Sequence, residues 1–326
     1  MKIALVEPLA VPDSVILELS APIRAMGHEF VAYDSVSETT EELIKRSRDC
    51  DVVMIANHPF PEEAIEAADH LKMISVAFTG IDHVAVDACR NRKIMICNAA
   101  GYSNETVAEL IIGMAVDALR NVVRADRAVR SGGTSVGIGG REIRGRKVGI
   151  IGLGRIGLMT AKYFQAFGAE VVAYSRSRKE EAVRSGIRYV ALEELLSQCD
   201  IVSVNLPLND ETRGFLSRER IAQMKPDAVL INCARGPIVD NQALADALNG
   251  DRLGFACVDV YDMEPPLPES YPLLHAKNTL LTPHQAFISE ESMVRRARIV
   301  FDNVTAWLKG EPVNVCGSYC RTGALL

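Results

Sequence analysis

Residues 148–157 read Val-Gly-Ile-Ile-Gly-Leu-Gly-Arg-Ile-Gly, an apolar run that passes directly into closely spaced glycines. Gly152, Gly154 and Gly157 have the G-x-G-x-x-G spacing, and a helical pattern follows over residues 158–167. In this spacing the first glycine allows a tight turn, the second lets the backbone approach a pyrophosphate, and the third lets helix and strand pack closely. The legible strand and helix on either side therefore predict a dinucleotide site at a helix N-terminus. The alternative is a glycine-rich turn of an α/β domain, which also needs small residues.

The composition is that of a globular chain with more than one domain. The chain has 326 residues, 48% of them hydrophobic, and a single core rarely extends beyond about 250–300 residues. A net charge of −6 argues against nucleic acid as the main partner. The most apolar stretch, residues 110–119, is interrupted by Asp117, so we expect no membrane span. The N-terminal apolar run ends at Glu7, too early for a signal-peptide core.

The cysteines are scattered and form no CxxC pair. Most of the eight lie in or beside apolar runs, where a cysteine behaves as a small buried hydrophobe. This pattern predicts a reducing, cytoplasmic location and no metal site. Cys316 and Cys320 are interpreted as free thiols of a flexible tail, with a disulfide or a metal site as the alternative.

Short β-rich runs alternate with helical patterns along the chain, which predicts parallel sheets with helices on both faces. The strands expected in the first third are residues 3–6, 30–33, 51–56, 73–78 and 94–98. A second set, which begins with the strand before the glycines, comprises residues 148–151, 170–174, 200–205, 228–233, 254–259 and 279–282. Six parallel strands with a glycine turn after the first indicate a Rossmann-type domain.

The helical patterns suggest how the two sets of strands are connected. The clearest stretches are residues 14–26, 39–48, 102–130 and 289–307, and a glycine-rich loop is expected at residues 131–140. The last helix follows the last strand, so we expect it to pack back onto the first domain. The prediction is an α/β protein with two doubly wound parallel-sheet domains. A Rossmann NAD(P)-binding domain, residues 99–287, is inserted into a flavodoxin-like substrate domain, residues 1–98 plus 288–326.

An arginine, a carboxylate and a histidine each follow one of the last three predicted strands. These residues are Arg235, Glu264 and His284. Ligands of open parallel sheets bind outside the carboxyl ends of the strands, so we expect all three residues at the edge of the sheet where a ligand binds. There a guanidinium can bind a carboxylate, and a histidine held by a carboxylate can donate the proton that carbonyl reduction requires. Taken singly, each of the three has an ordinary surface explanation. Their joint placement indicates an active site.

These stretches resemble the D-isomer specific 2-hydroxyacid dehydrogenase family over nearly the whole chain. The matching motifs, in order, are Gly-Leu-Gly-Arg-Ile-Gly at 152–157, Asn-Cys-Ala-Arg-Gly-Pro-Ile-Val-Asp at 232–240, Asp-Val-Tyr-Asp-Met-Glu-Pro at 259–265 and Thr-Pro-His at 282–284. The resemblance implies that Arg235 binds the 2-oxo-carboxylate. It implies that His284 is the general acid and base, and that Glu264 orients it and favours its protonated form.

The same resemblance implies contacts with substrate and cofactor. Residues 77–82 look like the family's substrate loop, in which Phe78, Thr79 and Gly80 meet the substrate, and the loop at 57–60 is a second candidate for lining the pocket. Asp259 is expected at the nicotinamide carboxamide. The other expected cofactor contacts are Thr106, Arg155, Ile156, Leu206, Pro207, Thr212, Cys233 and Ala234. The family is usually dimeric through the cofactor domain, so a homodimer that uses the long helix and its following arm is expected.

One position departs from the usual dinucleotide pattern. An acid that meets the adenosine ribose is expected about 20 residues beyond the glycines. Here that place holds Ser175, followed by Arg176, Ser177 and Arg178. A serine beside two arginines would bind a 2′-phosphate that an acid would repel, which predicts NADP as the cofactor, with NAD as the alternative. In that alternative the arginines are solvated cations near Glu180 and Glu181.

The function that follows is reduction of a 2-oxo acid to the D-2-hydroxy acid. Glyoxylate or hydroxypyruvate is the expected substrate, because NADP-preferring members of the family often reduce them. Aromatic and branched 2-oxo acids stay open, and no feature favours phosphite or formate oxidation. The alternative to an enzyme is a binding protein, a dinucleotide-sensing corepressor of the same fold. The compact length and short tails argue against this alternative.

Overall fold

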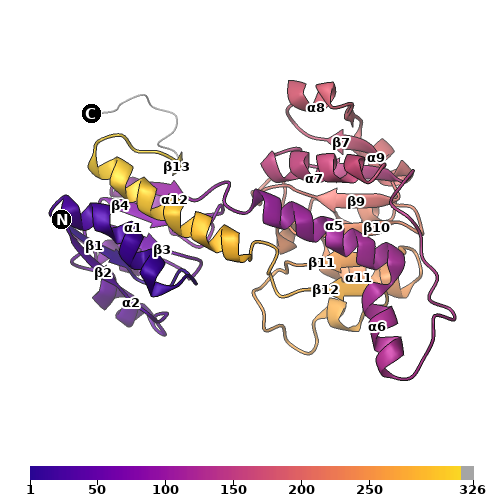
Figure 1. Ribbon diagram of the computed structural model, residues 1–326, viewed down its shortest axis with the longest axis horizontal. Helices are drawn as coiled ribbons and strands as arrows, with labels where there is room; N and C mark the ends of the chain where they lie inside the picture. Colours follow the sequence, from indigo (N-terminus) through magenta and orange to yellow (C-terminus); the bar gives the residue numbers. More distant parts are fainter. Residues whose placement is uncertain (317–326) are drawn as a thin grey trace. The chain divides into compact units, whose positions relative to one another are not determined.

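The computed structural model describes residues 1–316 and divides into two compact units, each built on one sheet (Figure 1). Unit 1 comprises Met1–Ser103 and the segment that begins at Ile288, and unit 2 is Asn104–Phe287. The first boundary follows Ser103, whereas the sequence placed it after residue 98. The predicted fold class, with two doubly wound sheets, is confirmed.

Unit 1 has the strand order of flavodoxin-like domains. The order is β13-β5-β4-β3-β1-β2, in which the first five strands along the chain are parallel. These strands are β1 (Lys2–Leu5), β2 (Glu29–Ala32), β3 (Val52–Ile55), β4 (Met73–Val76) and β5 (Met95–Asn98). All four residues of β3 and of β4 are buried, as expected for strands covered on both faces.

The edge of this sheet corrects the interpretation of the C-terminal segment. Val315–Cys316 forms β13, which pairs antiparallel with β5. The Cys316 thiol lies near the Ile96 carbonyl oxygen (3.4 Å). Cys316 is therefore part of the sheet and not of a flexible tail, while Cys320 lies outside the described residues.

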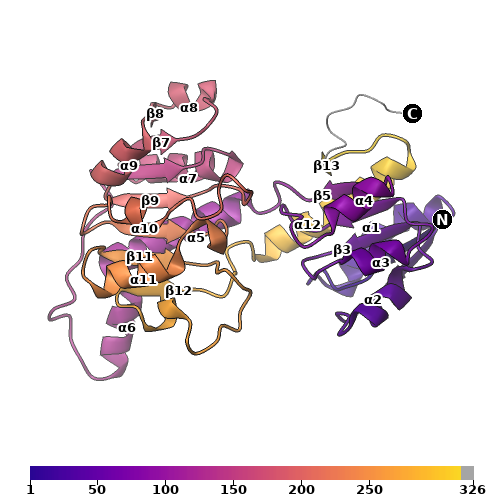
Figure 2. The same cartoon turned by 180° about the vertical axis from the view of Figure 1, so that it is seen from behind.

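Helices cover both faces of this sheet (Figures 1 and 2). One face carries α1 (Asp13–Ala25) and α12 (Glu290–Leu308), and the other carries α2 (Thr40–Ser47), α3 (Glu62–Glu66) and α4 (Val86–Asn91). The helix α12 returns to unit 1 after the whole of unit 2. Its Val300 carbonyl accepts a hydrogen bond from Ser75 Oγ (3.0 Å), and Asn303 donates to the Asn98 carbonyl (3.0 Å). These bonds tie the helix to β4 and β5.

Unit 2 has the Rossmann strand order, extended by one strand. The order is β12-β11-β10-β9-β6-β7-β8, all parallel. The strands are β6 (Lys147–Ile151), β7 (Glu170–Tyr174), β8 (Arg188–Tyr189), β9 (Ile201–Val204), β10 (Val229–Asn232), β11 (Phe255–Val258) and β12 (Thr279–Leu281). The sequence predicted six of them. It missed β8, whose two residues are too short to show a period.

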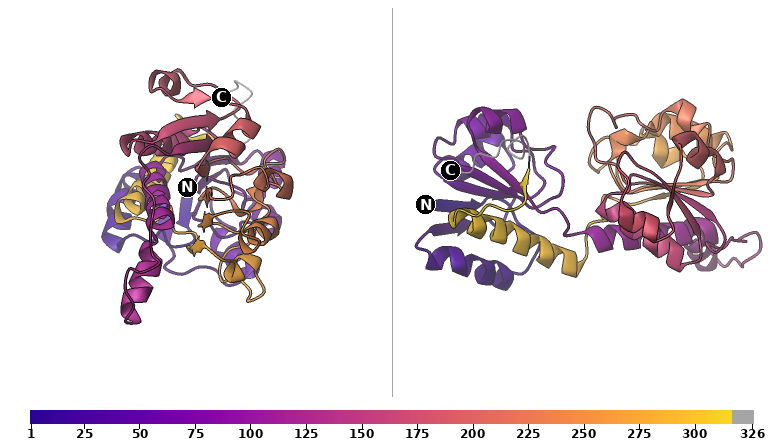
Figure 3. Two further views of the ribbon diagram at one scale, coloured as in Figure 1. Left: turned by 90° about the vertical axis from the view of Figure 1, so that its right-hand side faces the viewer. Right: turned by 90° about the horizontal axis from the view of Figure 1, so that it is seen from above.

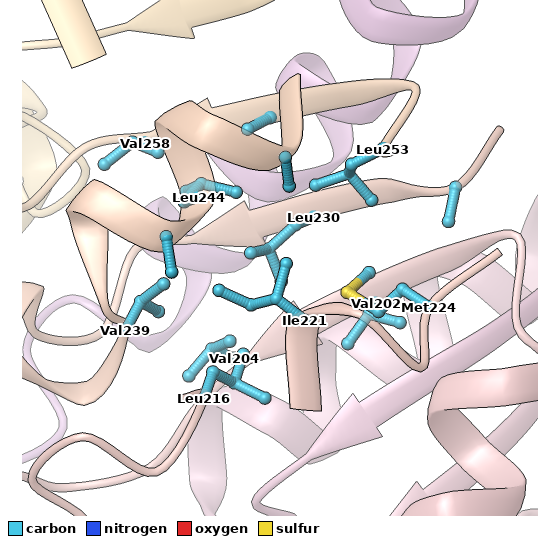
Figure 4. Close-up of a cluster of buried hydrophobic side chains, with 14 of the residues drawn as sticks. Val202, Val204, Leu216, Ile221, Met224, Leu230, Val239, Leu244, Leu253 and Val258 are labelled. Carbon is cyan, nitrogen blue, oxygen red and sulfur yellow. The ribbon is translucent and has the colours of Figure 1, made fainter. Parts of the chain in front are cut away.

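The sheet of unit 2 packs a hydrophobic core on each face. Helices α5 (Asn104–Arg120) and α7 (Arg155–Ala166) cover one face, and α9 (Leu192–Gln198), α10 (Arg218–Ile221) and α11 (Asn241–Asn249) cover the other. The short α8 (Glu180–Arg184) follows β7. Figure 4 shows the second core, in which Val204 and Leu230 of the strands meet Leu216, Ile221 and Leu244. These two layers hold the sheet rigid, so its carboxyl edge can fix the positions of loops.

The long helix predicted over residues 102–130 is two helices. The break lies at Asn121, which has a left-handed backbone (φ 54°), and α6 (Val122–Arg130) starts directly after it. The Asp117 carboxylate accepts the Val123 N–H (2.7 Å), and the Asn121 side chain donates to the Gly139 carbonyl (2.8 Å). Asparagine adopts this conformation more readily than most residues, and that allows the turn.

No described helix has both the length and the apolar character needed to cross a membrane. Among the described residues no cluster of histidine, cysteine or acidic side chains has the arrangement of a metal site.

Candidate active site

The glycine turn joins β6 to α7. Gly152 has a positive φ of 91°, and a Cβ there would lie 2.6 Å from the Asn205 carbonyl oxygen. A Cβ on Gly157 would lie 2.1 Å from the Gly152 carbonyl oxygen. These two glycines are therefore required by the fold itself, because any side chain would separate the helix from the strands.

The middle glycine has a different environment, which fits a dinucleotide. A Cβ on Gly154 would meet nothing within 4 Å, so the space beside it is open. Gly154 is the N-cap of α7 and offers no side-chain hydrogen bond, and the first turn holds no acid but the exposed Arg155. A helix N-terminus of this kind attracts an anion. The residues present thus fit a pyrophosphate.

The loop after β7 holds the residues that were expected to meet the adenosine ribose. Ser175 directly follows the strand, and Arg176 is 90% exposed, with its Nη1 3.4 Å from Glu211 Oε2. The Arg178 guanidinium lies over the Tyr189 ring (5.6 Å). Two other acids near this loop have partners outside it, since Glu180 pairs with Arg184 and Glu181 with Lys162.

The remaining expected cofactor residues are distributed over three elements. Leu206, Pro207 and Thr212 lie in the loop after β9, Cys233 and Ala234 follow β10, and Thr106 lies in the first turn of α5. The Thr212 hydroxyl donates to the Pro207 carbonyl (2.6 Å), which closes the loop after β9. Burial raises the pKa of the Cys233 thiol, so this cysteine stays protonated.

Arg235, Glu264 and His284 follow three strands that are neighbours in the sheet, β10, β11 and β12. His284 Nδ1 lies 2.9 Å from Glu264 Oε2 and 3.0 Å from Oε1. The ring of His284 is also packed edge-on against Phe287, with centroids 5.4 Å apart. Arg235 Nη1 donates to the Ala234 carbonyl (2.8 Å). The structure thus brings the histidine and the glutamate into direct contact and places the arginine on the adjacent strand end.

The loops that carry these residues are bound to one another. A Cβ on Gly236 would lie 1.9 Å from the Tyr261 carbonyl, so only glycine lets the two loops approach. Asn241 donates to Asp262 (2.6 Å), and the Tyr261 hydroxyl donates to the Thr282 carbonyl (2.9 Å). Sequence reasoning missed these supporting residues. The one available signal was the glycine directly after Arg235.

Asp259 holds the loop that carries His284. Its carboxylate is fully buried and accepts the Thr282 hydroxyl (2.5 Å) and the Gln285 and Ala286 N–H groups (2.9 Å each). The His284 N–H donates to the Asp259 carbonyl (2.8 Å). In this structure Asp259 positions the histidine loop, and its contact with a carboxamide stays a prediction.

The expected substrate loop lies in unit 1, after β4. Phe78 is buried under the Arg296 guanidinium, which lies 5.2 Å from the ring centroid. Asn98 donates to the Thr79 carbonyl (2.7 Å), while the Thr79 side chain is exposed and Gly80 is half-buried. The backbone of this loop is therefore fixed from two sides.

Comparisons with known proteins agree on one family. Residues 112–286 match the model of the D-isomer specific 2-hydroxyacid dehydrogenase NAD-binding domain. A hydroxypyruvate reductase of Blautia hydrogenotrophica is 35% identical, over 90% of this chain and 93% of that protein. A glyoxylate reductase of Korarchaeum cryptofilum is also 35% identical, over 85% of this chain and 86% of its own length.

The chain belongs to the D-isomer specific 2-hydroxyacid dehydrogenase family. It is therefore an NAD(P)-dependent oxidoreductase that acts on a CH–OH group. Among solved structures, an acyclic imino acid reductase in complex with NADPH and D-Arg superposes with a TM-score of 0.87 at 29% identity, covering 97% of this chain and all of that one. The expectations of family and enzyme class from the sequence are confirmed.

The different environments of two glycines predict different outcomes for the same substitution. Gly154→Ala should keep the thermal stability of the protein but weaken binding of the dinucleotide about tenfold or more, because the methyl group fills the open space. Gly157→Ala should lower the unfolding temperature by several degrees, since its methyl group meets backbone. Thermal unfolding and fluorescence titration with cofactor measure the two effects. Equal losses of stability in both variants would contradict this distinction.

Proposed function

We propose that this enzyme reduces a 2-oxo acid of the glyoxylate or hydroxypyruvate kind to the D-2-hydroxy acid. The contact of His284 with Glu264 at the edge of a dinucleotide-binding sheet carries the proposal. The names of the two sequence relatives support this choice of substrates. They also favour an enzyme over a corepressor, because both are reductases.

Each residue of the site has a task in this reaction. Glu264 accepts the Nδ1 proton of His284, so Nε2 is the atom that gives a proton to the carbonyl oxygen. The Arg235 guanidinium binds the substrate carboxylate as a planar fork. The reduced nicotinamide, when bound, supplies the hydride that adds to the carbonyl carbon. In this proposal unit 2 binds the cofactor, and unit 1 binds the carboxylate through backbone amides near Thr79 and Gly80.

Removal of the proton donor should abolish turnover without loss of cofactor. We expect His284→Ala to lower kcat by about 100- to 10,000-fold while dinucleotide binding persists. The measurement is the loss of nicotinamide absorbance with glyoxylate and hydroxypyruvate. His275→Ala, at an exposed histidine of the same unit, is the control.

A companion variant separates binding from proton transfer. Arg235→Lys should mainly raise KM for the 2-oxo acid, since an ammonium group cannot reproduce the fork. If both variants kept wild-type kcat/KM, the assigned roles would be wrong.

We propose NADPH as the preferred reductant. The loop after β7 has Ser175 where an acid would repel a 2′-phosphate, and Arg176 is exposed beside it. Arg176 pairs with Glu211, but both side chains are exposed, so a phosphate can replace the glutamate. Glu180 and Glu181 are paired with Arg184 and Lys162. The similar imino acid reductase has NADPH bound, which supports the same choice.

Loss of Arg176 should therefore be selective for one cofactor. Arg176→Ala is expected to lower kcat/KM for NADPH about tenfold and to leave the value for NADH nearly unchanged, because a charge-assisted bond to phosphate is lost. Arg252→Ala, at an exposed arginine before β11 and so at the other edge of the sheet, is the matched control. A wild-type preference for NADH that Arg176→Ala does not alter would end this proposal.

We also propose that the protein is a homodimer through unit 2. Helix α6 buries none of its residues and extends away from the sheet of its unit (Figures 1 and 3). Val129 on this helix is 71% exposed, and Val136 in the following arm is 88% exposed. In this proposal the helix and the following arm are covered by a second copy of the chain.

A charge on this helix should break the dimer. We expect light scattering to give the mass of two chains for the wild type and the mass of one chain for Val129→Glu. Val183→Glu changes an exposed valine of α8 in the same way and should remain dimeric. A wild-type protein of single-chain mass would refute the assembly.

We place the enzyme in the cytoplasm, because the described cysteines are free thiols and most of them are buried. Cell fractionation that recovers the protein away from cytoplasmic markers would contradict this location.

A further inference from the structure

Glu264 lies in a loop, residues 262–270, that is bounded by two buried tyrosines of unit 2. Tyr261, directly before the loop, is 8% exposed, and Tyr271, directly after it, is 4% exposed. The two rings pack edge-on, with their centroids 5.7 Å apart. Every residue between them is exposed or half-buried, so the loop leaves the core at Tyr261 and returns to it at Tyr271. The position of Glu264 therefore depends on how these two ends are joined.

Asp262, the first residue of this loop, joins its beginning to its end. The Asp262 Oδ1 atom accepts hydrogen bonds from the Tyr271 hydroxyl and from Asn241 Nδ2 (2.6 Å). Asn241 is the first residue of α11 and is 4% exposed, so the second bond ties the loop to a helix that packs on the sheet. Burial and the hydrogen bond to Asp262 raise the pKa of Tyr271, so its hydroxyl stays protonated and remains a donor.

The other tyrosine is bound to the loop that carries His284. The Tyr261 hydroxyl donates to the Thr282 carbonyl (2.9 Å), two residues before the histidine. Tyr271 thus holds one of the two loops and Tyr261 the other, and the contact of the two rings joins them. The glutamate and the histidine, whose side chains lie 2.9 Å apart, therefore share one support.

We propose that Asp262 and Tyr271 are positioning residues that hold Glu264 in place by closing its loop. This inference rests on the proposed function, in which the glutamate orients the proton donor. The Glu264 side chain is 68% exposed, so packing alone does not fix it. A loop joined at both ends has fewer conformations than one anchored at a single end, and a displacement of about 1 Å in an active site can lower turnover about 100-fold. The bond from Tyr271 to Asp262 therefore keeps the carboxylate within reach of the imidazole.

Variants at these two positions should lower turnover and leave binding intact. Tyr271→Phe removes only a hydroxyl, and we expect kcat to fall about three- to tenfold. Asp262→Ala removes the acceptor of both bonds and should lower kcat about tenfold or more. KM for the 2-oxo acid and for the dinucleotide should stay within about twofold, because the variants act on the orientation of the histidine. Asp262→Asn keeps an oxygen that accepts the Tyr271 hydroxyl, so it should restore most of the turnover.

A double-mutant cycle distinguishes positioning from a general loss of structure. Glu264→Ala leaves no carboxylate to position, so adding Asp262→Ala or Tyr271→Phe should change the residual kcat by less than about twofold. A merely structural role would instead lower kcat by the same factor with and without Glu264.

Crystal structures measure the same contact without turnover. In the wild type His284 Nδ1 should lie within hydrogen-bond distance of Glu264, and in Asp262→Ala this distance should exceed about 3.5 Å. A wild-type crystal structure without this contact would contradict the proposed support.

Asp246→Ala is the matched control for Asp262→Ala. Asp246 lies on α11, and its carboxylate also accepts two side-chain bonds, from Arg218 (2.7 Å) and Gln242 (2.9 Å). Neither bond reaches the loop of Glu264. This variant should therefore keep both the kcat of the wild type and the distance between the imidazole and the carboxylate.

The outcomes separate this inference from the function on which it rests. If Asp262→Ala keeps the wild-type kcat, loses the same factor with and without Glu264, or leaves the distance unchanged, the positioning role is overturned while reduction of 2-oxo acids stands. If the wild type reduces no 2-oxo acid, the proposed function fails, and the crystal structures alone decide whether Asp262 positions Glu264. A loss of turnover that depends on Glu264, together with a longer distance, supports the inference.

Discussion

The buried carboxylate of Asp259 is the contact on which the rest of the site depends. His284 has a left-handed backbone (φ 55°), a conformation that an ordinary residue adopts only when its surroundings enforce it. Asp259 enforces it from both sides, because its carbonyl accepts the His284 N–H and its carboxylate accepts the next two N–H groups. Since Asp259 directly follows β11 and is fully buried, the position of the imidazole is set by the sheet and not by the exposed loop. Glu264 then only has to orient a ring whose backbone is already fixed.

The two units present different side chains at the same edge of their sheets, where the parallel strands end. In unit 2 the first strand, β6, ends in a glycine turn at the start of a helix that offers no acid, which suits an anion. In unit 1 the first strand, β1, ends in a buried glutamate that binds a histidine. A carboxylate in that place disfavours a phosphate and favours groups that donate hydrogen bonds. The residue at the end of the first strand thus distinguishes an edge suited to an anion from one suited to groups that donate hydrogen bonds.

Sequence patterns predicted the features that depend on the period of apolar residues and on the positions of strand ends. The alternation of strands and helices and the glycine spacing were enough for both sheets, and the rule that ligands bind at carboxyl ends placed Arg235, Glu264 and His284. The features that the sequence patterns did not predict are short, or they depend on residues far apart in the chain. The strand β8 has two residues, β13 is an edge pair formed with a strand more than two hundred residues earlier, and the break at Asn121 depends on hydrogen bonds to Asp117 and Gly139. The pairing of Glu7 with His58 joins two strand ends 51 residues apart. A charge at the end of a buried strand was its one signal, and the rule that placed Arg235 applies to Glu7 as well.

Burial also determines which side chains keep their protons at the carboxyl edge of the unit 2 sheet. Burial raises the pKa of Tyr261 to about 12, and burial together with a hydrogen bond to Asp262 raises the pKa of Tyr271 further. Burial likewise raises the pKa of the Cys233 thiol, so none of these groups releases its proton near neutrality. Their fixed protons serve as structural donors, as the bond from Tyr261 to Thr282 shows. The His284 side chain, 19% exposed, and that of Glu264, 68% exposed, retain access to water. In the proposed reaction this pair can therefore exchange a proton with solvent after each turnover, while the groups beneath it keep theirs.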